Sequence, residues 1–294
     1  MSRRIRVLAA LACALVLPGC GRDPSATPTQ DRAGMTVAVD EVLAAKVPEP
    51  IRSDGTLVVG IDPAYPPAEF LAEDGRTVIG FDVELFDAVA AKLGLRTRYA
   101  VGKFDDLVLA VKAGKYEVGV SSFTINPARK QNALMVSYFQ AGTLWATRQG
   151  NPGAVDPNAA CGKKVAVQAT TVQENDLRLR SADCKAKKLP EITISVYEQQ
   201  KHATAAVLDG RDDAMLAYSP VGGYAVAQSR GALQLIGEVY DVSLYGYAVA
   251  PTQPALAETL RDALKALIAD GTYTTLLTKW GINGGAIKDP KVNP

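Results

Sequence analysis

Apolar residues between positions 56 and 280 follow two alternating patterns, one typical of buried strands and one typical of amphipathic helices. Thr56–Ile61 is apolar and β-branched, which predicts a strand. Leu85, Val89 and Leu93 then recur at helical spacing and predict a helix with one buried face. Because strands and helices keep alternating along the chain, the pattern predicts an α/β fold whose parallel-type sheets are covered by helices on both faces.

Ligands of open α/β sheets bind outside the carboxyl ends of strands. The predicted strands are Thr56–Ile61, Leu95–Val101, Tyr116–Ser121, Lys164–Gln168, Ile192–Tyr197, Asp213–Ala217 and Tyr245–Ala250. The predicted helices are Phe81–Leu93, Asp105–Ala113, Thr171–Ser181, Gln199–Asp209, Ser219–Gln228, Pro254–Ala269 and Thr272–Trp280. The strand ends that could border a ligand are Asp62–Tyr65, Ser121–Thr124, Gln168–Thr171 and Tyr218.

The segment Gly119–Arg129 carries the clearest candidate binding residue. Asn126 is a typical N-cap and Pro127 fits a first helical turn, so Arg129 is expected in the first turn of a helix. A planar guanidinium beside hydroxyls and free N–H groups can hold a carboxylate through two parallel hydrogen bonds. The alternative is a solvated surface arginine. The hydroxyl residues that precede it are Ser121, Ser122 and Thr124.

The first twenty residues have the pattern of an export signal. Three arginines precede the apolar segment Val7–Leu17, which is too short to span a membrane. The following Leu17–Cys20 resembles the lipobox of bacterial lipoproteins, although Pro18 is unusual at its place. This resemblance implies that residues 1–20 form a lipoprotein signal peptide, cleaved before Cys20, which becomes a lipid-modified N-terminus. The alternative is simple secretion with cleavage nearby.

Residues 21–50 are predicted to form a flexible tether. Gly21–Gly34 is rich in Pro, Thr, Asp and Ser and has almost nothing to bury. Within the rest of the tether, Val39–Lys46 is compatible with a short helix before two prolines. Two acyl chains on Cys20 would anchor such a chain stably to a membrane, whereas a single chain would not.

Composition and cysteine usage narrow the class of protein. The 294 residues are 48% hydrophobic and 21% charged, and the formal net charge is +1, so no concentrated basic face favours nucleic acid. Once Cys13 leaves with the leader and Cys20 takes lipid, Cys161 and Cys184 remain as an even pair, which predicts a disulfide in an oxidising compartment. Neither has a histidine at metal-ligand spacing, so no metal or other cofactor is expected.

From about residue 55 to residue 282, the chain resembles the bacterial extracellular solute-binding proteins of family 3, the receptors of ABC importers for polar amino acids. The composition and the cysteine pair are similar to those of actinobacterial members. The matching motifs, in the family's order, are Leu57–Pro67, Gly80–Leu85, Ala113–Val118, Ser121–Arg129, Gly162–Gln168 and Asp270–Tyr273.

The resemblance implies a two-lobed periplasmic-binding-protein fold of type II, with two mixed sheets flanked by helices and joined by two hinge strands. Lobe 1 is expected to comprise residues 51–144 and 246–294, and lobe 2 residues 145–245. The chain is expected to cross between the lobes at Ala141–Gln149 and Ser243–Ala248.

The same resemblance implies a carboxylate clamp. Arg129 would bind the α-carboxylate of the ligand, with help from Thr124 and the backbone at Ser122, next to Ser121. Thr171 would add contacts from the other lobe, where a helix N-terminus favours negative charge.

Four more residues are candidates for ligand contact, and three of them, Tyr65, Phe104 and Asp62, occupy positions that touch the ligand in relatives. Tyr65 and Phe104 would flank it, Asp62 would contact its side chain and Gln168 would bind a polar side chain. The alternatives are core packing for the two aromatic residues, a turn for Asp62 and a strand end for Gln168.

The chain departs from the family pattern at two places. Tyr218 stands where relatives usually have an aspartate that neutralises the α-ammonium of the ligand. The segment Thr170–Val172 lacks the glycine and the second threonine of the family motif. The amine end of the site and the identity of the solute therefore stay open.

Three classes of function follow from the resemblance. The first is a receptor that closes on a small amino acid or related carboxylate and delivers it to a membrane permease. The second is an enzyme on the same fold, such as a dehydratase of cyclic carboxylic acids, but His202 is the only histidine and no nucleophile–base pair is evident. The third is a ligand sensor that reports to a signalling partner. We expect a monomeric, non-enzymatic receptor, lipid-anchored through Cys20 to the outer face of the cytoplasmic membrane.

Overall fold

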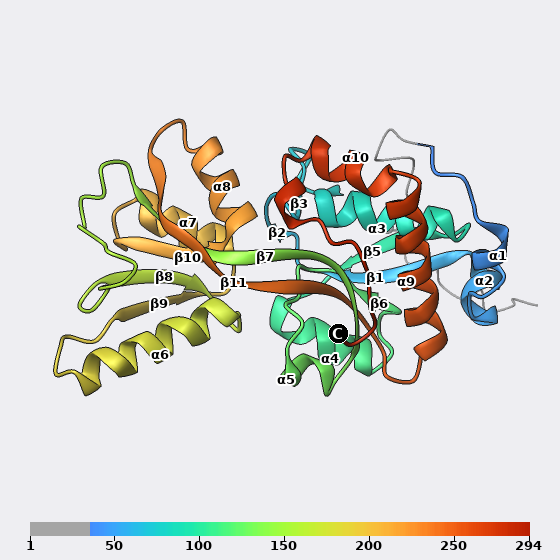
Figure 1. The fold of residues 1–294 in the computed structure, drawn as a ribbon, viewed down its shortest axis with the longest axis horizontal. Helices are drawn as coiled ribbons and strands as arrows, with labels where there is room; N and C mark the ends of the chain where they lie inside the picture. Colours follow the sequence, from blue (N-terminus) through green and yellow to red (C-terminus); the bar gives the residue numbers. More distant parts are fainter. Residues whose placement is uncertain (1–35) are drawn as a thin grey trace, which may run out of the picture.

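The computed structural model describes residues 36–294 (Figure 1). The predicted signal peptide, the lipidation site at Cys20 and the first part of the tether lie outside the described residues. Among residues 36–294, no helix combines the length and the apolar character that a membrane span needs.

Helices and strands alternate along the described chain. The strands are β1 (Thr56–Ile61), β2 (Ala64–Tyr65), β3 (Glu69–Leu71), β4 (Val78–Ile79), β5 (Arg96–Val101), β6 (Val118–Gly119), β7 (Leu134–Arg148), β8 (Lys164–Gln168), β9 (Thr193–Tyr197), β10 (Ala214–Tyr218) and β11 (Leu233–Val249). The helices are α1 (Glu41–Ala44), α2 (Glu49–Asp54), α3 (Phe81–Lys92), α4 (Phe104–Lys112), α5 (Pro127–Lys130), α6 (Val172–Ala186), α7 (Gln200–Leu208), α8 (Ser219–Gln228), α9 (Pro254–Ala269), α10 (Thr272–Lys279) and the 3-10 turn η1 (Asn283–Gly285).

The strands form an eight-stranded mixed sheet in the order β5-β1-β6-β11-β7-β10-β8-β9, with a separate small sheet of β2, β3 and β4. Parallel pairs lie at the two ends of the large sheet, β5-β1-β6 and β10-β8-β9, and antiparallel pairs join them in the middle. The predicted α/β fold with mixed sheets flanked by helices is therefore confirmed, and the two predicted sheets are continuous with each other through β7 and β11. The two halves are connected by backbone hydrogen bonds through β7 and β11.

Two lobes share the long strands β7 and β11, which run through both (Figure 1). The segments predicted to cross between lobes, Ala141–Gln149 and Ser243–Ala248, lie within these strands except for Gln149, which follows β7. Their pairing is irregular between Ile236 and Tyr240 and again between Tyr240 and Ser243. A bulged strand bends and twists at the irregularity. The strands are therefore bent close to the predicted hinge.

Alternating side chains of the strands face helices on opposite sides of the sheet. In β8, Val165 packs in the same cluster as Leu177 of α6, whereas Ala166 packs with Ala203 and Val207 of α7. Successive residues of a strand point to opposite faces, so a strand buried on both faces is apolar throughout. This burial explains why the apolar pattern predicted the strands β1 and β8 with the observed bounds; the helices α8 and α9 also have the predicted bounds.

The folded body begins earlier than the sequence predicts. Within the segment predicted as a tether, α1 and the start of α2 are ordered helices, and Asp40 caps α1 by accepting the N–H groups of Val42 and Leu43. Leu43, Val47 and Ile51 are buried in the main core. Their spacing of four residues forms an apolar stripe. The tether prediction is therefore wrong for residues 41–50, because burial of this stripe outweighs the effect of the neighbouring prolines.

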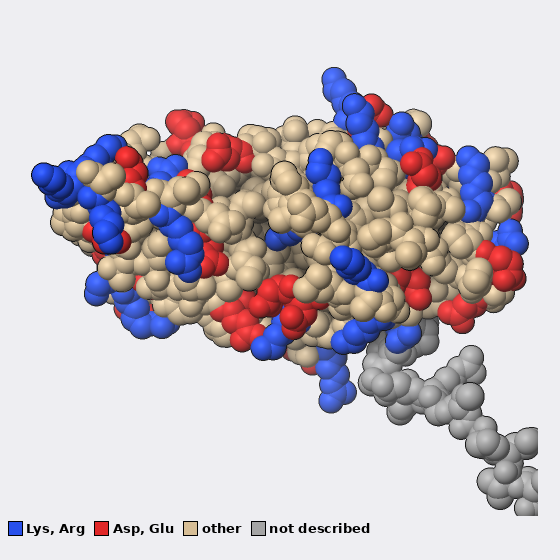
Figure 2. All heavy atoms as spheres, turned by 90° about the horizontal axis from the view of Figure 1, so that it is seen from below, with Lys and Arg blue, Asp and Glu red and all other residues tan. Residues whose placement is uncertain are grey.

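Charged side chains are unevenly spread over the face seen from below (Figure 2). Basic side chains are spread over both lobes and several lie together at the left end, whereas a group of acidic side chains gathers near the middle, beside a hollow. Helix α4 lies on this side of the molecule, and its first turn carries the exposed residues Asp105 and Asp106. On this face, negative charge therefore borders the region between the lobes.

Candidate functional site

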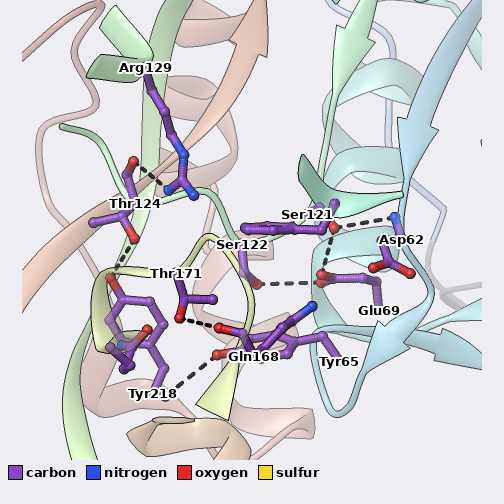
Figure 3. Close-up of a pocket in the computed structure, with 12 residues that line it drawn as sticks. Asp62, Tyr65, Glu69, Ser121, Ser122, Thr124, Arg129, Gln168, Thr171 and Tyr218 are labelled. Carbon is purple, nitrogen blue, oxygen red and sulfur yellow. Dashed lines mark hydrogen bonds between the residues drawn. The ribbon is translucent and has the colours of Figure 1, made fainter. Parts of the chain in front are cut away.

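A pocket between the lobes gathers side chains from strand ends that lie far apart in the sequence (Figure 3). All ten residues predicted to bind a ligand line it, together with two that were not predicted, Glu69 and Gln173. The lining residues are Asp62, Tyr65, Glu69, Phe104, Ser121, Ser122, Thr124, Arg129, Gln168, Thr171, Gln173 and Tyr218.

Arg129 is held by the short helix α5, as the sequence predicts. Asn126 caps this helix by accepting the Arg129 N–H at 2.9 Å, and Pro127 is in the first turn. The guanidinium donates from Nη1 to the carbonyl oxygen of Thr124 at 3.0 Å. It also lies over the rings of Phe104 and Phe123, 5.3 and 5.5 Å from their centroids. The aromatic rings and the carbonyl fix the cation in place at the pocket wall; Figure 3 shows its hydrogen bond to Thr124.

The Arg129 cation is buried without a carboxylate partner. None of the ion pairs within residues 36–294 includes it. Burial lowers its pKa to about 10, so it keeps its charge at neutral pH. A buried charge is costly unless it is paired. The pocket therefore offers an anion-binding group that is complete only when a ligand supplies the anion.

Hydrogen bonds between the lobes close the pocket. The hydroxyl of Tyr218, at the end of β10, lies 2.6 Å from Oγ1 of Thr124 in the other lobe. The Tyr218 N–H also points at the hydroxyl of Tyr65, 3.5 Å away. At the surface, an ion pair of 2.8 Å joins Lys103, before α4, to Glu198, after β9. The structure therefore shows the lobes in contact around the site.

Two buried acidic residues, Asp82 and Glu69, form an acid pair that contacts the chain just after β6. Ser122 at this point has a φ of 47°, in the left-handed region. Asp82 accepts hydrogen bonds from the Ser122 N–H at 2.9 Å and Oγ at 3.0 Å, and from the Tyr138 hydroxyl at 2.7 Å. Glu69 accepts from Ser121 Oγ at 2.9 Å. Burial and the neighbouring Asp82 raise the pKa of Glu69 well above its ordinary value. Since two buried carboxylates in contact cannot both ionise, the pair shares a proton.

Asp62 follows β1 and lies beside this acid pair. Its N–H donates to Ser121 Oγ at 3.3 Å, and its carboxylate accepts from the backbone of Phe104. Burial raises the pKa of Asp62 to about 6, with smaller upward contributions from the acidic groups of Glu198 and Asp105. The carboxylate is therefore ionised at neutral pH and costly to leave unpaired.

Lobe 2 contributes the start of α6. Thr171 caps this helix by accepting the Glu174 N–H at 3.2 Å, and its hydroxyl donates to the Gln168 carbonyl at 2.8 Å. The Gln168 side chain donates to the carbonyl of Glu198 at 3.3 Å. A helix start with free N–H groups favours negative charge. This helix start lines the same pocket as Arg129, and its first turn also carries Glu174, whose carboxylate accepts the Thr170 N–H.

The sequence offered weak signals for the two lining residues that were not predicted. Glu69 belongs to β3, in a small sheet whose two- and three-residue strands are too short for a periodic pattern. Gln173 is in the first turn of α6 and donates to Thr143 Oγ1 at 3.1 Å. The predicted helix start at Thr171 could have pointed to Gln173.

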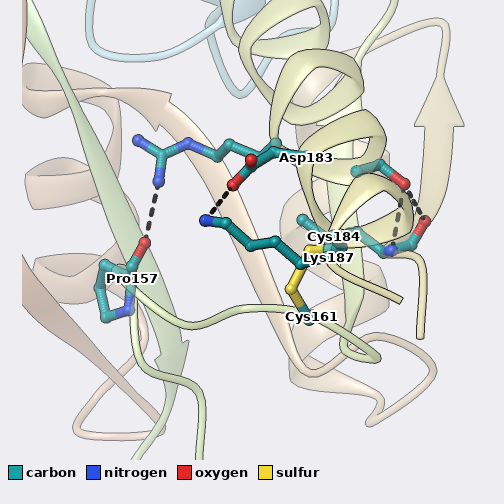
Figure 4. The surroundings of a disulfide bond; sticks show 8 residues. Pro157, Cys161, Asp183, Cys184 and Lys187 are labelled. Atoms are coloured by element: carbon teal, nitrogen blue, oxygen red, sulfur yellow. Dashed lines mark hydrogen bonds and ion pairs between the residues drawn. A yellow bond between two sulfur atoms is a disulfide. The ribbon is translucent and has the colours of Figure 1, made fainter. Parts of the chain in front are cut away.

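The structure joins Cys161 and Cys184, the two cysteines that the residue count predicts to pair (Figure 4). The bridge ties the loop before β8 to the last turn of α6, the helix whose first turn lines the pocket. In the described part of the chain, no group of three His, Cys, Asp or Glu side chains is arranged to hold a metal ion.

These features define a class of protein: a two-lobed receptor that encloses a small solute between its lobes. The chain belongs to the bacterial extracellular solute-binding proteins, family 3, whose profile matches residues 57–283. It is 36% identical over 252 residues to the arginine-binding protein ArgT of Corynebacterium glutamicum, covering 85% of this chain and 82% of that protein. It is 28% identical to the L-cystine-binding protein TcyJ of Escherichia coli, covering 84% and 90%.

Solved structures show the same fold. An ancestral arginine-binding protein bound to arginine matches with a TM-score of 0.71 and 29% identity, covering 77% of this chain and 98% of that one. An ancestral amino acid-binding protein, described as a precursor of cyclohexadienyl dehydratase, matches with a TM-score of 0.70 and 29% identity, covering 79% and 98%. All four of these proteins are described as binding proteins, and this chain is a solute-binding protein of the same family.

Proposed function

We propose that this protein is the extracytoplasmic receptor of an ABC importer for an amino acid with a cationic side chain, such as arginine. The receptor encloses the amino acid between its lobes and delivers it to the permease. The observation that carries the proposal is the separation of charge in the pocket: the Arg129 cation lies at one side, and the Asp62 carboxylate lies at the other, beside Glu69 (Figure 3). A ligand with a carboxylate and a distal cation matches both sides.

The surroundings of Asp62 support a cationic ligand. Asp105 is exposed, takes part in none of the ion pairs among residues 36–294 and extends the negative charge of Asp62 toward the surface; Glu198 acts on Asp62 in the same sense but is paired with Lys103. A cleft lined by one sign of charge concentrates ligands of the opposite sign and speeds their association. The names of two of the matched proteins agree, since one is an arginine-binding protein and the other was solved with arginine bound.

Titration calorimetry and thermal unfolding with L-arginine and L-citrulline test this proposal. Citrulline has the same shape as the arginine side chain but no charge, so it serves as a matched control. We expect arginine, at a hundred times its dissociation constant, to stabilise the folded protein by about 2.7 kcal/mol. We expect citrulline to bind at least ~30-fold more weakly, because Asp62 is then left without a cation. Equal binding of both compounds, or binding of neither, would contradict the proposal.

The membrane anchor is a separate part of the proposal, supported by the sequence from Arg3 to Cys20. We expect intact-mass analysis of protein from native membranes to show a mature chain that begins at a diacylglyceryl-modified Cys20. The Cys20→Ser variant is expected to leave the membrane fraction, because two acyl chains are what hold the protein there. An unmodified N-terminus beyond residue 20 in the native protein would refute the anchor without affecting the binding site.

A further inference from the structure

We propose that the site recognises the carboxylate and the distal cation of its ligand and does not require an α-amino group. Carboxylates with a guanidinium at the far end of the chain and no α-amine, such as 5-guanidinopentanoate, are then ligands alongside arginine. This inference rests on the proposed function and narrows it, because it states which charged groups of the ligand contribute to binding.

The side of the pocket that holds Arg129 contains no second charged group. The guanidinium donates to the carbonyl oxygen of Thr124, and the hydroxyl of the same residue is hydrogen-bonded to Tyr218. Gln173 hydrogen-bonds Tyr218 from α6. Burial raises the pKa of Tyr218, so its phenol stays protonated and neutral. The pKa of Arg129 responds to Tyr218 and Tyr65 but to no carboxylate.

The carboxylates that line the pocket are on its other side. Asp62 and Glu69 are the two acidic residues among the twelve lining residues, and both lie across the pocket from Arg129 (Figure 3). Glu69 shares its proton with Asp82, which is also bound by Ser122 and Tyr138. Asp62 is thus the group best able to pair with a cation.

The geometry of an α-amino acid decides where its amine must go. A single carbon separates the α-ammonium from the carboxylate, so a carboxylate on Arg129 places the ammonium beside Arg129, Thr124 and Tyr218. There it loses its water, meets only neutral acceptors and lies close to a buried cation. Neutral hydroxyls accept its hydrogen bonds but supply no opposite charge, and the nearby Arg129 cation repels it. The contacts at this position therefore offset little of the free energy that the ammonium loses when it leaves water.

Three arginine-like probes separate the contributions: L-arginine, 5-guanidinopentanoate without the α-amine, and agmatine without the carboxylate. With the wild-type protein, we expect calorimetry to give 5-guanidinopentanoate an affinity within about tenfold of that of arginine. We expect agmatine to bind at least ~30-fold more weakly than arginine, because Arg129 is then left unpaired.

The variant Tyr218→Asp supplies the carboxylate that the pocket lacks near Arg129. We expect it to shift the ratio of the two affinities at least ~tenfold in favour of arginine, since only arginine carries an amine to pair with the new charge. Gln228→Glu adds a charge at the exposed end of the same helix, α8, and is expected to leave the ratio unchanged.

The outcomes distinguish this inference from the proposed function. If the wild-type protein binds arginine but binds 5-guanidinopentanoate more than a hundredfold more weakly, the inference is wrong and the receptor function stands. An unchanged ratio in Tyr218→Asp would likewise overturn it. If neither arginine nor 5-guanidinopentanoate binds, the proposed function itself fails.

Discussion

Replacement of Arg129 by alanine is expected to abolish ligand binding and leave the protein folded. The guanidinium is buried, held by Thr124 and two aromatic rings, and has no carboxylate partner among the described residues. A ligand carboxylate that loses this partner stays buried and unpaired. The cost is on the order of 2–5 kcal/mol, which weakens the affinity by about 30-fold to several thousandfold. Titration calorimetry with L-arginine measures the loss.

Two control variants separate recognition from folding. Arg129→Lys keeps the charge but loses the planar pair of donors, so we expect intermediate binding. Arg98→Ala removes an exposed arginine from β5 and should bind like the wild type. The melting temperature of Arg129→Ala should not fall, because the substitution removes a buried, unpaired charge from the unliganded protein. Undiminished binding by Arg129→Ala would mean that the ligand occupies another place.

Much of the site could be predicted from the sequence because its residues end strands of regular pattern. Parallel strands in each lobe place their carboxyl ends at one edge, so Ser122 and Gln168 face a common crevice once β6 and β8 are recognised. The start of α5 could also be predicted, since Asn126 is a favoured N-cap residue and Pro127 is favoured in a first helical turn. Local signals of this kind act within a few residues and need no knowledge of the tertiary structure.

The parts that were missed depend on contacts between distant segments. Most of β11 was missed because its residues between positions 236 and 244 are partly exposed and do not alternate regularly, and only pairing with β7 makes them a strand. Glu69 comes to the pocket through a small sheet that packs beside α3. The contact of Asp82 with Ser122 joins residues forty positions apart. It stabilises a left-handed backbone at Ser122 that no local sequence signal predicts.

The contact between Tyr218 and Thr124 has the same origin, because it exists only when the lobes meet. From sequence, Tyr218 could be recognised only as a departure from the family pattern. The structure gives the departure a physical meaning, since the phenol makes a neutral hydrogen bond in the region where an ammonium would lie. The cation of the ligand must then be sought at Asp62.

Binding of a cationic ligand is expected to weaken about tenfold between pH 7.5 and pH 5, because protonation of Asp62 removes its partner. Burial raises the pKa of Asp62 to about 6, so most of the free protein has an ionised Asp62 at the higher pH and about one tenth has it at the lower pH. Glu198 and Asp105 face the same group and oppose its ionisation, whereas Lys201 favours it. Calorimetry with L-arginine at both pH values measures the change.

Ionisation of Asp62 affects folding stability and ligand affinity in opposite directions, so the two pH dependences can be told apart. The folded, unliganded protein holds a proton on Asp62 up to about pH 6, whereas the unfolded chain releases it at the ordinary, lower pKa. Asp62 therefore lowers the free energy of unfolding as the pH rises through this window, while the affinity for the cation increases. Thermal unfolding without ligand follows the first change and calorimetry the second.

The variant Asp62→Asn tests the assignment directly. It keeps the size of the side chain and the backbone N–H bond to Ser121, but it has no charge to lose. We expect it to bind L-arginine at least ~30-fold more weakly at pH 7.5 and to show little further loss at pH 5. Because Asp62 is costly to ionise in its buried place, the unliganded variant should melt at an equal or higher temperature at pH 7.5. A wild-type affinity that does not change with pH, or an Asp62→Asn variant that keeps the wild-type dependence, would place the ligand's cation elsewhere in the pocket.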